Sequence, residues 1–146
     1  MDLETARQRF ASARVARLAT ASDSGQPHLV PLVFAVRNDL GHGHTVCFAV
    51  DHKPKRSRQL RRLDNIAANP AVSLLVDHYA DDWSTLWWVR VDGTATVLDA
   101  ESDDGRSAID ALVAKYRQYD QVRPAGPVVV VRELTWHGWS AEVASD

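Results

Sequence analysis

Six stretches with strand character and few helical segments predict a mainly β (α+β) fold. We expect a six-stranded antiparallel barrel, closed or partly closed, with two or three flanking helices. Short turn sequences such as SDSGQP and NDLGHG join most of the strands, which favours antiparallel neighbours. The chain has 146 residues, of which 45% are hydrophobic, so a single domain over 1–146 with its own core is expected.

The first third of the chain predicts a short helix and then an antiparallel meander. In the segment DLETARQRFASA, apolar residues recur at the spacing of one helix face. Three strands follow, and the second, HLVPLVFAV, is apolar on both faces. The expected strands are residues 14–21, 28–36 and 45–50.

The rest of the chain predicts two further helices and three further strands. A helix over about 56–67 ends before Pro70, because the residue before a proline avoids the α region. A helix from about 101 to 117 has acids at its start and Lys115 and Arg117 at its end, which complements the helix dipole. The expected strands are residues 71–79, 86–98 and 128–139.

The segment DHKPKRSRQLRR places cations where a helix begins, although that end of a helix normally attracts acids. The whole chain has a formal net charge of −2, while residues 53–62 contribute +6, so the other 136 residues sum to −8. First-turn N–H groups lack partners within a helix, and added cations would complete a phosphate site. Taken alone, such a run is more often a solvated basic face. The candidate phosphate ligands are Lys53, Lys55, Arg56, Ser57 and Arg58.

Two strands carry features that indicate a ligand or a partner chain. Alternation along 86–98 puts Trp88 on the polar face, where it exposes apolar area unless something covers it. This predicts a homodimer with Trp88 and Arg90 near the interface, or else cover by a loop such as 118–127. Pro31 cannot donate a ladder hydrogen bond, which marks an edge or irregular position in the second strand. A flavin-like ring laid along that strand would cover its apolar outer side.

Several function classes are not favoured. Cys47 lies in an apolar run and reads as a core residue, and the histidines have no metal-ligand spacing. No motif for nucleophilic or acid–base catalysis occurs, so catalytic residues remain unassigned and no metal is expected. The acidic net charge argues against nucleic acid, and no run is long enough to span a membrane. With no secretory signal, a cytoplasmic location is expected. This pattern suits a protein whose chemistry resides in a bound cofactor.

The segments RVARLATASDSGQPHLVPLVFAV, NPAVSLLVD and VRVDGTA, in this order, resemble the pyridoxamine 5′-phosphate oxidase-like flavoproteins. The resemblance extends over about residues 5–140. Within that superfamily the chain is most similar to small actinobacterial members thought to use the deazaflavin coenzyme F420, and arginine outnumbers lysine 14 to 3, as in GC-rich genomes. The resemblance implies an FMN-binding-like split β-barrel and a homodimer with the cofactor in a groove between subunits.

The resemblance also implies roles for particular residues. Basic residues at the helix start would hold the cofactor phosphate, which agrees with the charge pattern. Pro31, Leu32 and Val33 would lie beside the ring system, and Trp83 and Trp88 near the cofactor or the interface. The chain lacks the C-terminal arginine-rich segment of true pyridoxamine phosphate oxidases, so we do not expect that substrate.

The predicted function is hydride transfer between F420 and a small unsaturated substrate. FMN is the alternative cofactor, and six clustered cations exceed what one FMN phosphate needs. A non-catalytic carrier of a flavin, F420 or a pigment on the same fold is a second hypothesis. A small nucleic-acid binder is a third.

Overall fold

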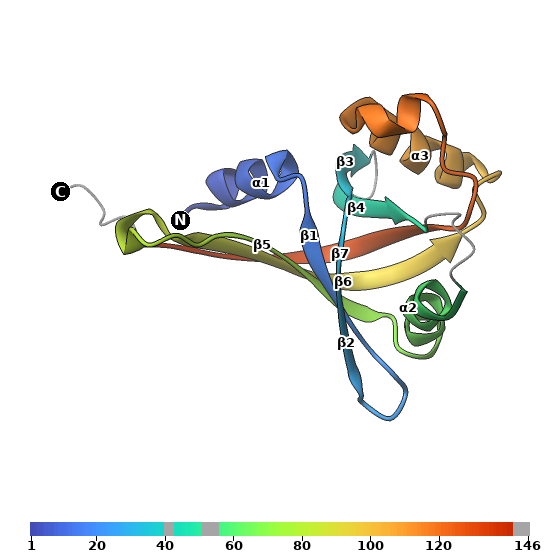
Figure 1. Ribbon diagram of the computed structural model, residues 1–146, viewed down its shortest axis with the longest axis horizontal. Coiled ribbons are helices and arrows are strands. Elements are labelled where there is room, and N and C mark those ends of the chain that lie inside the picture. The colour runs from blue at the N-terminus through green and yellow to red at the C-terminus, as the bar shows by residue number, and fades with distance from the viewer. Residues whose placement is uncertain (40–42, 51–55, 142–146) are drawn as a thin grey trace.

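The computed structural model describes residues 1–39, 43–50 and 56–141. In this part of the chain, seven antiparallel strands form one sheet in the order β2-β1-β5-β6-β7-β4-β3, flanked by three α-helices (Figure 1). This confirms the mainly β, split-barrel fold class. The helices are α1 (Leu3–Ser12), α2 (Arg56–Ala68) and α3 (Asp103–Lys115). The strands are β1 (Ala16–Ala21), β2 (Pro27–Leu32), β3 (Ala35–Asp39), β4 (Gly43–Ala49), β5 (Ala71–His78), β6 (Trp87–Leu98) and β7 (Val128–Ser140).

The expected count of six strands is wrong, because the apolar run 28–36 forms two strands. Its first part, β2, pairs with β1, and its second part, β3, pairs with β4. Val33 and Phe34 lie between these two strands, where the chain stops pairing with β1 and begins to pair with β4. A hydroxyl holds this junction: the Phe34 N–H donates to Tyr116 Oη at 3.1 Å. The chain therefore changes its strand partner at the Tyr116 hydrogen bond, and this change separates the two parts of the split barrel.

The barrel interior is filled by alternate residues of the strands, as expected from a period of two. Leu18, Leu74, Val89 and Phe34 are fully buried there, and Phe10 of α1 packs against Phe34 with ring centroids 4.9 Å apart. Cys47 is also fully buried, in a second apolar cluster beneath α3. Its interpretation as a core residue is confirmed.

A bulge in β7 decides which side chains reach the outer face of the sheet. The pairing of β6 with β7 shifts between Asp92 and Thr94, and Glu133 adopts a positive φ of 57°. One extra residue in a strand reverses its alternation. Val131 therefore packs into the barrel before the bulge, Trp136 packs there after it, and His137 reaches the outer face.

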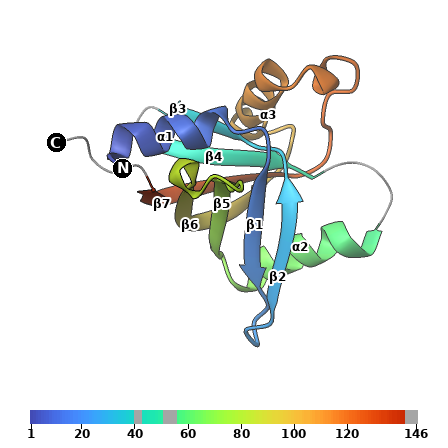
Figure 2. The ribbon, with the colours of Figure 1, turned by 60° about the vertical axis from the view of Figure 1, so that its left-hand side comes forward.

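The three helices cover the barrel at different places, and α2 is the one that begins with predicted phosphate ligands. It lies behind the β1–β2 hairpin, away from the free end of the β5–β6 hairpin (Figures 1 and 2). Asn65 of α2 donates to the Thr20 hydroxyl of β1 at 3.1 Å, and both side chains are buried. Ile66 is buried against the barrel core. These contacts fix α2 against the inner face of the hairpin.

Candidate cofactor site

The predicted phosphate ligands fall at the start of α2. Arg56, Ser57 and Arg58 lie in its first turn, which contains no acidic residue. Lys53 and Lys55 lie outside the described residues. In contrast, α3 has Asp103 and Asp104 in its first turn. The backbone there is helical, so the N-terminal turn of α2 carries cations, as the sequence indicates, where the N-terminal turn of α3 carries acids.

The structure places His28 of β2 near the last two arginines of this basic segment, Arg61 and Arg62. Arg62 is half-buried, and its Nε has no hydrogen-bond partner among the described residues. Burial lowers the pKa of Arg62. Burial, and then the charges of Arg61 and Arg62, lower the pKa of His28 on β2. A half-buried guanidinium with an unpaired donor beside like charges is unfavourable by itself and favourable around an anion. These residues fit a phosphate-bearing ligand.

Strand β2 lies at one edge of the sheet, which confirms the edge position inferred from Pro31. In the described part of the chain, only β1 pairs with this strand. On its other side, no described strand pairs with Pro31 or Leu32, and Val33 follows at the junction. Backbone donors and acceptors at an open edge can bind the polar rim of a planar ring. Whether these three residues bind a ring stays a prediction.

A groove of about 660 Å³ opens on the outer face of the sheet. Trp88 lies in its wall, so the expected position of Trp88 on the outer face is correct. No residue of 118–127 lines the groove, and the alternative that this loop covers Trp88 is therefore wrong. Leu29 is 68% exposed on the same face. The groove is lined by Arg17, Ala19, Leu29, Ser73, Leu74, Leu75, Asp77, Tyr79, Trp88 and Arg90.

A polar network lies beside this groove and is not predicted from the sequence. Asp92 accepts a hydrogen bond from Ser73 Oγ at 2.6 Å and from Arg90 Nε at 3.0 Å, and His137 Nε2 lies 3.3 Å from its Oδ2. Burial opposes ionisation of Asp92, but these hydrogen bonds and the charges of Arg90 and His137 outweigh it, so the pKa of Asp92 is lowered. The network depends on pairing of β5, β6 and β7 and on the β7 bulge, none of which a local motif reveals.

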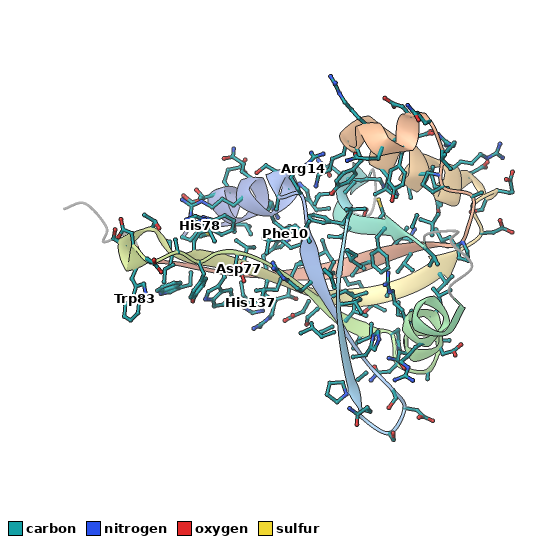
Figure 3. The ribbon with its side chains drawn as sticks, in the orientation of Figure 1. Phe10, Arg14, Asp77, His78, Trp83 and His137 are labelled. Carbon is teal, nitrogen blue, oxygen red and sulfur yellow. The ribbon has the colours of Figure 1, made fainter. Side chains whose placement is uncertain are left out.

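The groove and α2 lie on opposite faces of the β1–β2 hairpin. His28 faces Arg61 and Arg62 of α2, while the next residue, Leu29, lines the groove. Trp83 lies at the tip of the β5–β6 hairpin, far from α2, with 77% of its surface exposed (Figures 1 and 3). A single chain therefore brings Trp88, but not Trp83, to the groove, and neither to the start of α2.

With this geometry, the chain can be compared with known proteins. Residues 3–140 match the family model described as pyridoxamine 5′-phosphate oxidase, and the chain belongs to that family. No curated protein matches it.

Three solved structures share the fold. A conserved hypothetical protein from Mycobacterium tuberculosis, Rv2991, is 22% identical with a TM-score of 0.70, over 97% of this chain and 86% of that one. An FAD-binding protein from Mesorhizobium loti is 24% identical with a TM-score of 0.66, over 94% and 92%. The heme storage protein HutZ from Vibrio cholerae is 17% identical with a TM-score of 0.67, over 96% and 95%. At these identities the likeness establishes the fold.

Two features are absent from the described residues. No helix there has the length and apolar character needed to cross a membrane. No cluster of three or more His, Cys, Asp or Glu side chains is placed to hold a metal ion.

A second cationic cluster joins the end of α3 to the start of β1. Lys115 Nζ donates to the Ala13 carbonyl at 2.7 Å and lies 4.0 Å from the centroid of the Phe34 ring. Arg14 lies over the Tyr116 ring at 4.6 Å and donates to the Lys115 carbonyl at 3.1 Å. The helix dipole alone, which the sequence suggests for Lys115, does not account for these contacts. Burial, and then the charge of Arg14, lower the pKa of Lys115 to about 8.

The lowered pKa of Lys115 predicts that the free energy of unfolding rises with pH. Between about pH 8 and the ordinary lysine value of 10.5, the unfolded chain binds more protons than the folded chain, so stability increases with pH in that window. Urea denaturation at pH values from 7.5 to 9.5 measures this slope. We expect Lys115→Met, which keeps the apolar stem, to reduce the slope relative to Lys55→Met. An equal slope in both variants would assign it to other groups.

Proposed function

We propose that this protein is an F420-dependent oxidoreductase that acts as a homodimer on a small unsaturated substrate. The observation that carries the proposal is the concentration of positive charge in the basic region at α2. The region has six cations between 53 and 62, and one of them, Arg62, is half-buried with an Nε that has no partner among the described residues. A phosphate-bearing cofactor supplies the missing negative charge.

The residues have distinct parts in this proposal. Lys53, Lys55, Arg56, Ser57 and Arg58 hold the phosphate, with the first-turn N–H groups of α2. Pro31, Leu32 and Val33 present the open edge of β2 to the ring. Trp88, and Trp83 from its hairpin tip, lie away from the start of α2 in their own chain, so in the homodimer they cover apolar ring surface of the cofactor that the second copy holds. When bound, the cofactor supplies a hydride, from C5 of a deazaflavin or from N5 of a flavin. The chain binds it, orients it and keeps water away.

The number of cations favours F420 over FMN. F420 carries a phosphate and a polyglutamate tail, while FMN carries a single phosphate. One phosphate needs fewer cations than the six that this chain has in ten residues. The surplus, including Arg61 and Arg62 along α2, suits a longer polyanion. FMN remains the alternative, and an FAD-binding protein that shares this fold supports a flavin as the ligand.

The homodimer follows from the outer face of the sheet. The groove wall is apolar at Leu29 and Leu75, while Arg17 pairs with Asp77 at 3.7 Å and Arg90 with Asp92 at 3.0 Å. Charges paired within one chain can be covered by a second copy without leaving either partner unpaired. A second copy placed on this face would bury the exposed apolar side chains and enclose the cofactor.

The dimer proposal predicts the effect of a charge on the outer face. Leu29→Asp should raise the dissociation constant of the dimer by about tenfold or more, because it places an unpaired carboxylate in an apolar interface. Sedimentation equilibrium measures this constant. Val122→Asp is the matched control, since Val122 is an exposed apolar residue outside the groove. A wild-type chain that sediments as a monomer, or two variants with equal constants, would contradict the interface.

A second candidate function is heme binding without turnover. The specific observation is His137, whose Nε2 lies 3.3 Å from Asp92 Oδ2 beside the groove. A carboxylate in that position orients an imidazole and raises its basicity as an iron ligand. HutZ, a heme storage protein, shares the fold. In this case the groove would hold the porphyrin, and the His137 imidazole would supply a nitrogen ligand to the iron.

One set of titrations separates these functions. Purified protein is titrated with F420, FMN and hemin, following cofactor fluorescence for the first two and the Soret band for hemin. Tight F420 binding with weak FMN binding supports the deazaflavin proposal, and oxidation of bound reduced F420 by unsaturated acceptors then supports an enzyme. A preference for FMN assigns a flavin. A shifted Soret band that His137→Ala abolishes favours heme, and binding of none of the three would refute a cofactor site.

A further inference from the structure

A recess of about 320 Å³ lies apart from the outer groove, where the start of β1 meets the segment after α3. It is lined by Arg14, Val15, Val33, Tyr116, Gln118 and Tyr119. Figure 3 shows Arg14 between the end of α1 and α3. None of these residues except Val33 belongs to the site proposed for the cofactor.

The recess has an excess of positive charge. The guanidinium of Arg14 lies over one ring, Tyr116, and the ammonium of Lys115 lies 5.2 Å from the centroid of the same ring. Among the described residues, neither cation forms a salt bridge with a carboxylate. In contrast, five other arginines form described ion pairs, each with an Asp side chain, as Arg123 does with Asp110. Two close cations without an acid attract an anion.

The contacts of the cluster hold the Arg14 head group in place. Arg14 Nη2 donates to the Lys115 carbonyl, and Tyr116 Oη lies 2.9 Å from the Arg14 carbonyl. The link before β1 and the end of α3 therefore fix each other by reciprocal hydrogen bonds. A guanidinium that is held by one N–H and by a ring face keeps its other donors for a ligand.

The walls of the recess define the rest of the ligand. Val15 is 43% exposed, and Tyr116 and Tyr119 stand at 79° to each other with ring centroids 6.1 Å apart. Aromatic edges and faces together with an aliphatic side chain accept a flat apolar body. The Gln118 amide adds a polar group at the rim.

We infer that this recess binds a small aromatic carboxylate, with the carboxylate on Arg14 and the flat ring between Val15, Tyr116 and Tyr119. The site does not require the proposed function to be correct, since it shares only Val33 with the cofactor site. If both hold, the recess places an anionic small molecule on the other side of the β2–β3 junction from the barrel interior.

The lysine contributes at longer range. Lys115 does not line the recess, but its charge acts on the same ring and on Arg14. A carboxylate bound at Arg14 would stabilise the ammonium form of Lys115. Benzoate should therefore raise the pKa of Lys115, measured by NMR on the Nζ group, and benzamide should not.

The test uses benzoate as the probe and benzamide as its neutral analogue. Backbone amide shifts in ¹H–¹⁵N NMR spectra are followed while each compound is added to the full chain at low and high salt. We expect saturable shifts at Val15, Val33, Gln118 and Tyr119 with benzoate, and at least about fivefold weaker binding of benzamide. Shifts that gather at Arg17 and Arg90 instead, or equal binding of the two compounds, would overturn the inference.

Substitutions of exposed residues test the role of the Arg14 charge without disturbing the core. Gln118 is exposed at the rim, so Gln118→Glu places an acid beside Arg14 and should weaken benzoate binding about tenfold or more. Arg14→Gln should have a similar effect. Arg106→Gln is the control, because Arg106 is exposed on α3 and pairs with Asp103. If F420, FMN and hemin fail to bind while benzoate binds as expected, only the proposed function fails. No saturable benzoate binding refutes the recess whatever the cofactor result.

Discussion

Charge reversal at the start of α2 is expected to weaken cofactor binding strongly. In the double variant Lys55→Glu/Arg56→Glu, two charge-assisted contacts to the phosphate are lost, each contributing about 1.5–3 kcal/mol. The dissociation constant of F420 or FMN should rise about 10²- to 10⁴-fold. Repulsion between the new carboxylates and the phosphate adds to the loss. Fluorescence titration of the wild-type and variant proteins measures the effect directly.

The control variant carries the same change in net charge elsewhere. Arg106→Glu/Arg117→Glu reverses two exposed arginines, one near the start of α3 and one just after its end, away from the α2 region. It should bind the cofactor within about threefold of wild type at 0.15 M salt, because exposed charges beyond a Debye length are largely screened. If both double variants bind equally well, the position of the basic segment is irrelevant and the phosphate assignment is wrong.

Removal of the Tyr116 hydroxyl is expected to destabilise the fold at the β2–β3 junction. In Tyr116→Phe the ring still fills its buried position, but the Phe34 N–H loses its acceptor. The hydroxyl also lies 2.9 Å from the carbonyls of Arg14 and Phe34. A buried donor left without a partner costs about 1–3 kcal/mol. Urea denaturation at neutral pH should show a loss of that size in the free energy of unfolding.

Tyr79→Phe is the matched control for this change. Tyr79 is 63% exposed in the single chain, after the end of β5, so removal of its hydroxyl should alter the free energy of unfolding by about 0.5 kcal/mol or less. Equal losses in the two variants would mean that the Tyr116 hydroxyl does not hold the junction. A loss in Tyr116→Phe accompanied by weaker cofactor binding would connect the junction to the predicted ring site at Val33.

The fold is largely predictable because its signals are local. Alternation identifies most strand positions, and the apolar spacing of α1 and α3 identifies their buried faces, including Phe10 and Ile109. The division of 28–36 into β2 and β3 is not predictable in this way. That run is apolar on both faces, and what divides it is a hydroxyl from Tyr116, 82 residues away in sequence from Phe34.

The candidate site is only partly predictable, for a similar reason. The basic segment is contiguous, so its charge is visible in the sequence, and Trp88 follows from alternation along one strand. The Asp92 network brings together Ser73, Arg90 and His137 from three strands. His137 reaches it through the bulge near Glu133, which no local residue pattern specifies. The recess at Arg14 likewise depends on a contact between segments far apart in the sequence: residues 13–14, before β1, and residues 115–116, at the end of α3.

The most direct measurement of the central claim compares binding with and without the phosphate. FMN is paired with riboflavin, and F420 with its phosphate-free deazaflavin core, at low and high salt. If the start of α2 holds the phosphate, the phosphorylated member of the preferred pair binds at least about 10²-fold more tightly. That advantage should fall as salt rises and should disappear in Lys55→Glu/Arg56→Glu. Equal affinity of the two members, or an advantage that the double variant retains, would contradict the claim that this basic segment anchors a cofactor.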